Sequence, residues 1–194
     1  YKPSPSFVSI HLGVTKNLIE KDFNCHHIIV ENWNELENEK GVIFISIPTL
    51  LDSSLAPEGN HIIHAFTPSS IDKWENLTRE DYLKKKQLYY SFLIEKISKI
   101  IPNLDQNIDH KEIGTPRTHR KFLGRFEGSY GPIPNKKLFG LLPMPFNTTK
   151  IKNLYCVGDS CFPGQGLNAV AFSGYACAHK IGSKLNINSF NLPD

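Results

Sequence analysis

The chain has 194 residues, of which 40% are hydrophobic and 21% charged, as is typical of a globular protein with a buried core. Its formal net charge is only +3, and no dense basic run is interleaved with aromatic residues, so nothing indicates a nucleic-acid partner. No apolar run approaches the roughly 20 residues that cross a bilayer. The four cysteines show no CxxC pair and no zinc-ligand spacing, so we expect no metal site.

Short apolar runs separated by turns fill the first third of the chain. They predict strands at residues 7–14, 27–30, 42–47 and 61–67. The first alternates apolar and polar side chains, whereas the second and third are β-branched runs that suit buried strands. This succession of short strands and turns favours an antiparallel or mixed sheet.

The pattern then changes to helical spacing. Thr78 and Asp81 have the form of a capping box with Asp in place of the usual Glu. Apolar residues recur every three or four positions after it, which predicts a long helix over residues 78–101. A further strand is predicted at 107–114 and a short helix at 118–123.

Residues 124–145 are rich in glycine and proline, which predicts a long loop. Loops of this length are usually functional or disordered. Aromatic residues such as Tyr130 and Phe139 are interspersed in it, and such residues are scarce in disordered segments. We therefore expect this loop to pack against another part of the protein.

Residues 154–176 carry the most chemical information. They predict a buried strand that ends at Gly158 and Asp159, then a turn, then an alanine-rich helix that begins near Leu167 and Asn168. The exposed N–H groups of such a helix start would face an anionic or electron-rich group. The carboxylate at the strand end can accept hydrogen bonds from a polyol.

Two glycines in the turn, Gly164 and Gly166, allow the backbone to pass close to a ligand because no Cβ is in the way. An ordinary strand-turn-helix unit also accounts for these residue types. In that interpretation the glycines only make turns and the aspartate only caps the helix. Residue types alone leave both interpretations open.

The order of residues in this segment resembles the C-terminal FAD motif of the flavin-containing amine oxidase and phytoene desaturase superfamily. Within that superfamily, the string Gly-Asp-Ser-Cys-Phe-Pro-Gly-Gln-Gly at 158–166 is similar to that of the carotenoid (prolycopene) isomerases. Further matching stretches lie at 47–49, 51–59, 114–116, 118–120, 130–132 and 144–149. Leu167 and Asn168 depart from the Val-Ile or Val-Pro of the family, which we expect to alter local packing and not flavin binding, since the backbone N–H groups remain.

The resemblance implies an FAD cofactor in its reduced form. The residues that it assigns to the cofactor are Gly158, Asp159, Pro163, Gly164, Gln165, Gly166, Leu167 and Asn168. It implies a mixed α/β (α+β) fold, the C-terminal portion of a two-domain FAD-dependent oxidoreductase-like protein. Residues 1–115 would belong to the substrate-binding domain, with its mixed or antiparallel sheet, and residues 116–194 to the FAD-binding domain, with its last strand-turn-helix.

The dinucleotide fingerprint Gly-x-Gly-x-x-Gly does not follow a strand anywhere in these residues. Family members carry it near the N-terminus. We therefore expect the chain to be the back portion of a longer protein, without the N-terminal FAD-binding half. The start, residues 1–6, has neither the apolar region of a signal peptide nor the composition of a transit peptide.

The activity implied by the resemblance is redox-neutral cis–trans isomerisation of poly-cis lycopene to the all-trans isomer. The substrate would lie in an apolar tunnel lined by the strands of residues 7–67 and the 124–146 loop. Peripheral membrane association is implied, at the thylakoid or on the plastid or cytoplasmic side of a membrane in a phototroph, because a carotene dissolves only in lipid. Two alternatives stay open: a carotene desaturase that uses oxidised FAD, and a non-catalytic fragment that binds no flavin alone.

The eight histidines do not by themselves predict a metal or acid–base site. His26 and His27 are adjacent, and His61 and His64 are three apart, so each pair faces opposite sides of a strand. We expect structural roles for them, and a solvated surface position for His119. No catalytic acid or base is assigned from the sequence.

Overall fold

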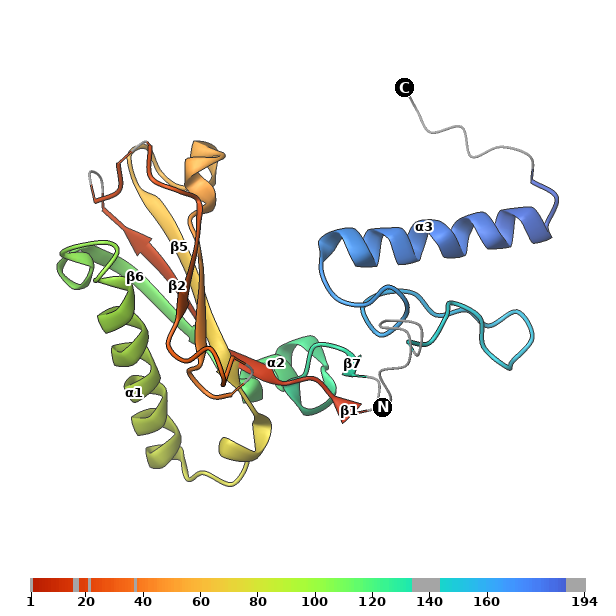
Figure 1. Cartoon of the computed structure of the whole chain (residues 1–194), viewed down its shortest axis with the longest axis horizontal. Coiled ribbons are helices and arrows are strands. Elements are labelled where there is room, and N and C mark those ends of the chain that lie inside the picture. Colours follow the sequence, from red (N-terminus) through yellow and green to blue (C-terminus); the bar gives the residue numbers. More distant parts are fainter. Residues whose placement is uncertain (1, 16–17, 21, 37, 134–143, 188–194) are drawn as a thin grey trace. The chain divides into compact units, whose positions relative to one another are not determined.

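The structure, a computed structural model, describes residues 2–15, 18–20, 22–36, 38–133 and 144–187. It comprises two compact units (Figure 1): Pro5–Ser129, and a second formed by Tyr1–Ser4 together with Tyr130–Asp194. Among the described residues, no helix is both long and apolar enough to cross a membrane. The expected functional division at residue 115 stays a prediction.

A five-stranded sheet forms the larger unit, and every neighbouring pair in it is antiparallel. In spatial order its strands are β3 (His26–Val30), β4 (Val42–Ser46), β5 (His61–Ser69), β2 (Ser6–Val14) and β6 (Ile108–Gly114). All five strands predicted between residues 7 and 114 are present, and the sheet is antiparallel, which is one of the two arrangements predicted for it. The prediction of a buried strand at 27–30 is wrong, because β3 is an edge strand on which Ile28 is 62% exposed.

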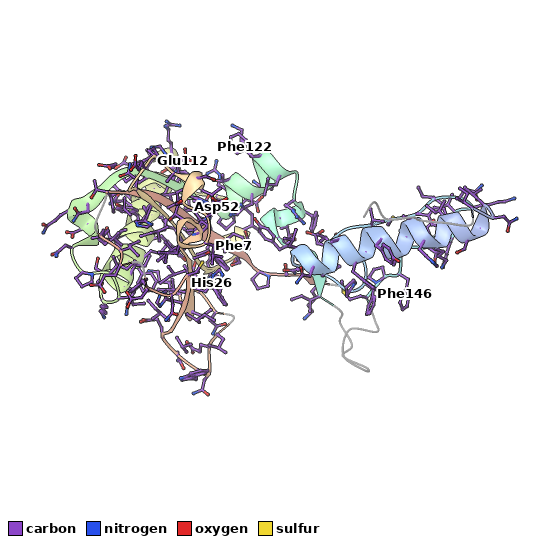
Figure 2. All side chains as sticks on the ribbon, turned by 90° about the horizontal axis from the view of Figure 1, so that it is seen from above. Phe7, His26, Asp52, Glu112, Phe122 and Phe146 are labelled. Atoms are coloured by element: carbon purple, nitrogen blue, oxygen red, sulfur yellow. The ribbon has the colours of Figure 1, made fainter. Side chains whose placement is uncertain are left out.

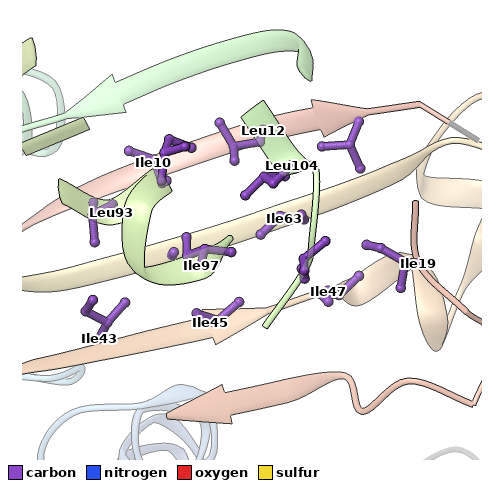
Figure 3. Close-up of a cluster of buried hydrophobic side chains, with 14 residues drawn as sticks. Ile10, Leu12, Ile19, Ile43, Ile45, Ile47, Ile63, Leu93, Ile97 and Leu104 are labelled. Atoms are coloured by element: carbon purple, nitrogen blue, oxygen red, sulfur yellow. The ribbon is translucent and has the colours of Figure 1, made fainter. Parts of the chain in front are cut away.

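One face of the sheet is covered by α1 (Arg79–Ile97), and the core lies between them (Figure 3). The alternation in β2 sends Ile10, Leu12 and Val14 into this core, each at most 1% exposed. The Thr78 hydroxyl accepts the backbone N–H of Asp81 and so caps the helix, as predicted. The helix ends at Ile97, earlier than predicted, and the chain then turns to place further apolar side chains in the same core.

Short helices complete this unit. They are η1 (Pro48–Leu50), η2 (Ser53–Leu55), η3 (Ile71–Lys73), η4 (Leu104–Asn107), α2 (Pro116–Leu123) and η5 (Phe126–Gly128). A reciprocal capping box between Thr115 and Thr118 starts α2, which confirms and slightly extends the helix predicted there.

The smaller unit contains one long helix, α3 (Leu167–Lys184), and a two-stranded sheet of β1 (Lys2–Pro3) and β7 (Pro132–Ile133). Ten residues of the predicted 124–145 loop, 134–143, including Phe139, lie outside the described residues. The predicted buried strand before residue 158 is wrong. Tyr155 makes only an isolated bridge with Thr148, and Val157 is 56% exposed, because no neighbouring strand of the described residues continues the ladder.

Candidate functional site

Of the eight residues assigned to a cofactor, six lie in the turn at 158–166, and Leu167 and Asn168 form the start of α3. Gly158, Gly164 and Gly166 all have positive φ, at 109°, 117° and 100°. Such angles are costly for residues with a Cβ, so these three positions require glycine for their backbone alone. The predicted glycine turn is therefore present, followed by a helix that begins at Leu167, as predicted.

The turn leaves space beside its backbone. A Cβ added at Gly158 or at Gly166 would meet no atom of the described chain within 4 Å, and one at Gly164 would meet only Met144 Cε at 3.8 Å. These glycines are thus not explained by crowding within the chain. Their open flanks form a cradle in which a ligand can lie against the main chain.

The start of α3 adds a partial positive charge to this cradle. Gly166 is the N-cap and offers no side chain to the first N–H groups of the helix, and Leu167 is 82% exposed. Uncapped N–H groups at a helix start attract negative charge. The carboxylate of Asp159 lies in the same turn and supplies an acceptor for hydroxyl groups.

Asn147 and Ser173 hold the turn against α3, and sequence reasoning missed both roles. The side-chain amide of Asn147 lies 2.9 Å from the Cys156 carbonyl, 3.0 Å from Ser173 Oγ and 3.2 Å from the Ser173 carbonyl. Ser173 is fully buried, and its Oγ also accepts the N–H of Gly158 at 3.3 Å. In the sequence, Asn147 is notable only as part of the matching stretch at 144–149, since nothing there indicates a contact across 26 residues.

The loop segment at 130–132 packs against the same turn. A Cβ on Gly131 would lie 2.8 Å from the Asp159 carbonyl oxygen and 3.6 Å from Gln165 Cγ, and the φ of Gly131 is +81°. This confirms that part of the 124–145 loop packs against another segment. Cys161, a residue of this turn, is buried, and the burial raises the pKa of its thiol above the ordinary value.

The larger unit carries a second feature, an apolar groove of about 830 Å³ on the face of the sheet opposite α1. Its floor contains three phenylalanines from adjacent strands, with ring centroids 4.9 Å apart for Phe7 and Phe66 and for Phe44 and Phe66. Other lining residues are Pro5, Ser6, Ile28, Val30, Trp33, Leu36, Val42 and Pro68. Among the described residues, none with a charged side chain lines this groove, so it suits a hydrocarbon.

A row of polar side chains crosses the same face beside the groove. The strand register places His26, Ser46, His64, His11 and Glu112 opposite one another on successive strands. The rings of His11 and His64 contact edge to face, with centroids 4.7 Å apart. Burial, together with the charge of His11, lowers the pKa of His64 below its ordinary value.

His119 is not at the surface, and that expectation is wrong. It is 8% exposed and its ring centroid lies 4.8 Å from that of Phe7, because α2 folds back over β2. Burial lowers the pKa of His119. Among the described residues, no three histidine, cysteine, aspartate or glutamate side chains are grouped so as to hold a metal ion.

Comparison with known proteins places this geometry in context. No protein-family model matches the chain. It is 54% identical over 189 residues to the chloroplastic prolycopene isomerase of Daucus carota, and 53% identical over 189 residues to that of Arabidopsis thaliana. The chain is homologous to the prolycopene isomerases. Each alignment covers 96% of this chain but only 31% and 32% of those proteins, so the chain spans about a third of their length.

Some more distant relatives are named for 4,4'-diapolycopene compounds. A 4,4'-diapolycopen-4-al dehydrogenase of Metabacillus indicus is 26% identical over 182 residues, covering 88% of this chain and 35% of that protein. A solved structure of an oxidoreductase from Methanosarcina mazei is 16% identical, with a TM-score of 0.45, covering 94% of this chain and 35% of that one. A structural similarity at that TM-score carries no argument about fold or function. The resemblance to carotenoid isomerases expected from residues 158–166 is confirmed by the plant proteins.

Proposed function

We propose that the full-length protein isomerises poly-cis lycopene to all-trans lycopene with reduced FAD, without net redox change, in a plastid of a phototroph. The observation that carries this proposal is the turn at 158–166. It combines three positive-φ glycines, two of them with open flanks, and an uncapped helix start. It occurs in a chain more than half identical to chloroplastic prolycopene isomerases.

The turn fits one part of a dinucleotide cofactor. The N–H groups at the start of α3 would face the pyrophosphate or the flavin ring, and Asp159 would accept hydrogen bonds from the ribityl hydroxyls. Gly158 and Gly166 would lie against the cofactor, since no chain atom fills the space beside them. When bound, reduced flavin supplies electron density or a proton that temporarily lowers the order of a conjugated double bond.

The chain's own residues would bind and orient the substrate. The groove floored by Phe7, Phe44 and Phe66 offers aromatic faces to a polyene, and its apolar lining excludes water. The groove supports the prediction that the first strands line the substrate tunnel. Because the substrate is a lipid-soluble hydrocarbon, the proposal includes peripheral attachment to a membrane.

The test is anaerobic incubation of the full-length protein with reduced FAD and poly-cis lycopene in liposomes, followed by chromatographic separation of the isomers. All-trans lycopene formed without consumption of an electron acceptor is the expected result. Asp159→Ala should lower flavin retention in the same preparation. No product and no bound flavin would refute the proposal and leave only the fold.

The second candidate is a carotene desaturase, favoured by the relatives at about a quarter identity that are named as a carotenoid-type dehydrogenase and oxygenase. It would require oxidised FAD and an electron acceptor. A product with more conjugated double bonds, formed only under those conditions, would assign the protein to the desaturases. The isolated chain of 194 residues, tested alone, shows whether this segment holds flavin without the rest of the protein.

A further inference from the structure

A second groove of about 830 Å³ lies in the larger unit, among α1, β6 and α2, and its lining is strongly basic. The cationic residues that line it are Arg79, Lys86, Lys111, Arg117, Arg120 and Lys121. Glu112 is the one carboxylate among its lining residues, and the uncharged ones are Leu77, Tyr82, Ile113, Thr118 and Phe122. The whole chain carries a net charge of only +3, so positive charge is concentrated here.

Few of these cations are neutralised within the described part of the chain. Arg120 forms an ion pair with Glu75 at 2.6 Å. Arg117 instead lies over the Tyr82 ring at 4.8 Å, and Arg117 and Lys121 have no carboxylate within ion-pair distance among the described residues. Gathering like charges in one concavity is unfavourable unless an anion enters it. The groove is therefore suited to a phosphate or similar anionic group.

Exposed apolar side chains lie next to this groove. Phe122, in its lining, is 72% exposed, and Leu123 and Phe126, which follow it along the chain, are 56% and 73% exposed (Figure 2 labels Phe122 on α2). The η5 turn that carries Phe126 is packed against α2, because a Cβ on Gly128 would lie 2.4 Å from the Pro116 carbonyl oxygen. Two aromatic side chains and a leucine are thus presented to solvent beside a basic groove.

We propose that this surface docks the protein on a membrane that contains anionic lipids. Lipid phosphates enter the groove beside Arg117 and Lys121, while Phe122, Leu123 and Phe126 enter the interface between headgroups and acyl chains. A soluble phosphate ligand would account for the cations but not for the exposed aromatic side chains. A bilayer surface accounts for both, because its anionic headgroups lie directly above an apolar layer.

This inference rests on the proposed function in one respect: a hydrocarbon substrate must be taken from lipid. The docking surface and the apolar groove floored by Phe66 both belong to the larger unit, Pro5–Ser129. Vesicle binding and catalytic turnover are separate measurements. Vesicle binding without turnover would retain the surface and refute the proposed function, whereas turnover without vesicle binding would refute only the surface.

The experiment is co-sedimentation of the full-length protein with vesicles of phosphatidylcholine alone and of phosphatidylcholine and phosphatidylglycerol in equal parts. Arg117→Gln with Lys121→Gln should weaken binding to the anionic vesicles roughly fivefold for each cation removed, hence about 25-fold together, and less at high salt. Phe122→Ser with Phe126→Ser should weaken binding to both kinds of vesicle, on the order of tenfold.

The matched control is Lys84→Gln with Lys99→Gln, which removes the same charge from exposed positions on and just after α1 in the same unit. This control should bind like the unaltered protein, and circular dichroism should show that every variant is folded. Equal weakening by the control and by Arg117→Gln with Lys121→Gln would overturn the proposal, since any charge would then suffice. The proposal would also be overturned if the protein did not bind vesicles but was stabilised by inorganic phosphate or bound duplex RNA in a salt-dependent way.

Discussion

Removing the side-chain amide of Asn147 tests whether the cofactor turn is held in place as the structure indicates. Three acceptors lie within 3.2 Å of this amide nitrogen, on Cys156 and Ser173, but an amide has only two hydrogens. At most two strong hydrogen bonds therefore exist at once, each worth about 1 kcal/mol net. Asn147→Ala should lower the free energy of unfolding by about 2 kcal/mol and also reduce flavin retention, because, in the described part of the chain, the turn would then be tied to α3 only through the Gly158 N–H and Ser173 Oγ.

The measurement is denaturant unfolding of the full-length protein, followed by circular dichroism, together with the flavin absorbance retained after gel filtration. Asn147→Asp serves as the matched variant, since it keeps the shape but replaces a donor with an acceptor facing two carbonyl oxygens. It should destabilise at least as much as Asn147→Ala. Ser173→Ala completes a double-mutant cycle, with an expected coupling energy of about 0.5–1 kcal/mol. Strict additivity of the two single losses would refute the reasoning.

Three further predictions concern the turn, the apolar groove and a buried histidine. Gly131→Ala should lower the free energy of unfolding by about 1–2 kcal/mol more than Gly124→Ala does, measured by chemical unfolding. Both glycines have positive φ, but only a Cβ at Gly131 would crowd a peptide carbonyl. Equal losses of stability in the two variants would contradict this. Ile28→Lys should weaken binding of a polyene to the apolar groove, measured by quenching of tryptophan fluorescence, with little loss of stability because the Ile28 side chain is largely exposed. The control Leu88→Lys, at an exposed position on α1, should not affect polyene binding. Equal effects of the two variants on binding would count against the groove. Burial lowers the pKa of His119, so its contribution to stability is complete above its ordinary pKa of 6.5 and declines as the pH falls toward the lowered value. His119→Gln should therefore reduce the loss of stability between about pH 7 and about pH 5, and an unchanged slope in the unfolding midpoint would refute this.

Local features of the fold were predictable because they depend on a few neighbouring residues. The alternation in β2, the cap at Thr78 and the glycines at 158–166 all act within a few positions of the chain, and the structure contains each of them. The string at 158–166 also pointed to the carotenoid isomerases, to which the chain is homologous. The predicted strand at 154–158 failed because a strand requires hydrogen bonds from a neighbour that local sequence does not supply.

Contacts between distant segments were not predictable from spacing. His11 and His64 are 53 residues apart, and they meet because the register of β2 with β5 pairs them. Asn147 and Ser173 contact each other across 26 residues through a turn whose path depends on several positive-φ glycines. Pairwise contacts of this kind depend on register and packing, which the whole chain determines.

By itself, the sequence determined the five strands of the larger sheet, the helix caps and the glycine turn, and to which proteins the chain is related, since these depend on residue identity over short stretches. Tertiary structure decided which faces are covered and what is brought together on the others. It placed β3 at an edge, aligned three phenylalanines across strands to floor an apolar groove, and gathered cations from α1, β6 and α2 into a second groove. The reason is that strand register and helix packing position side chains from separate elements side by side, and these arise only when the core forms.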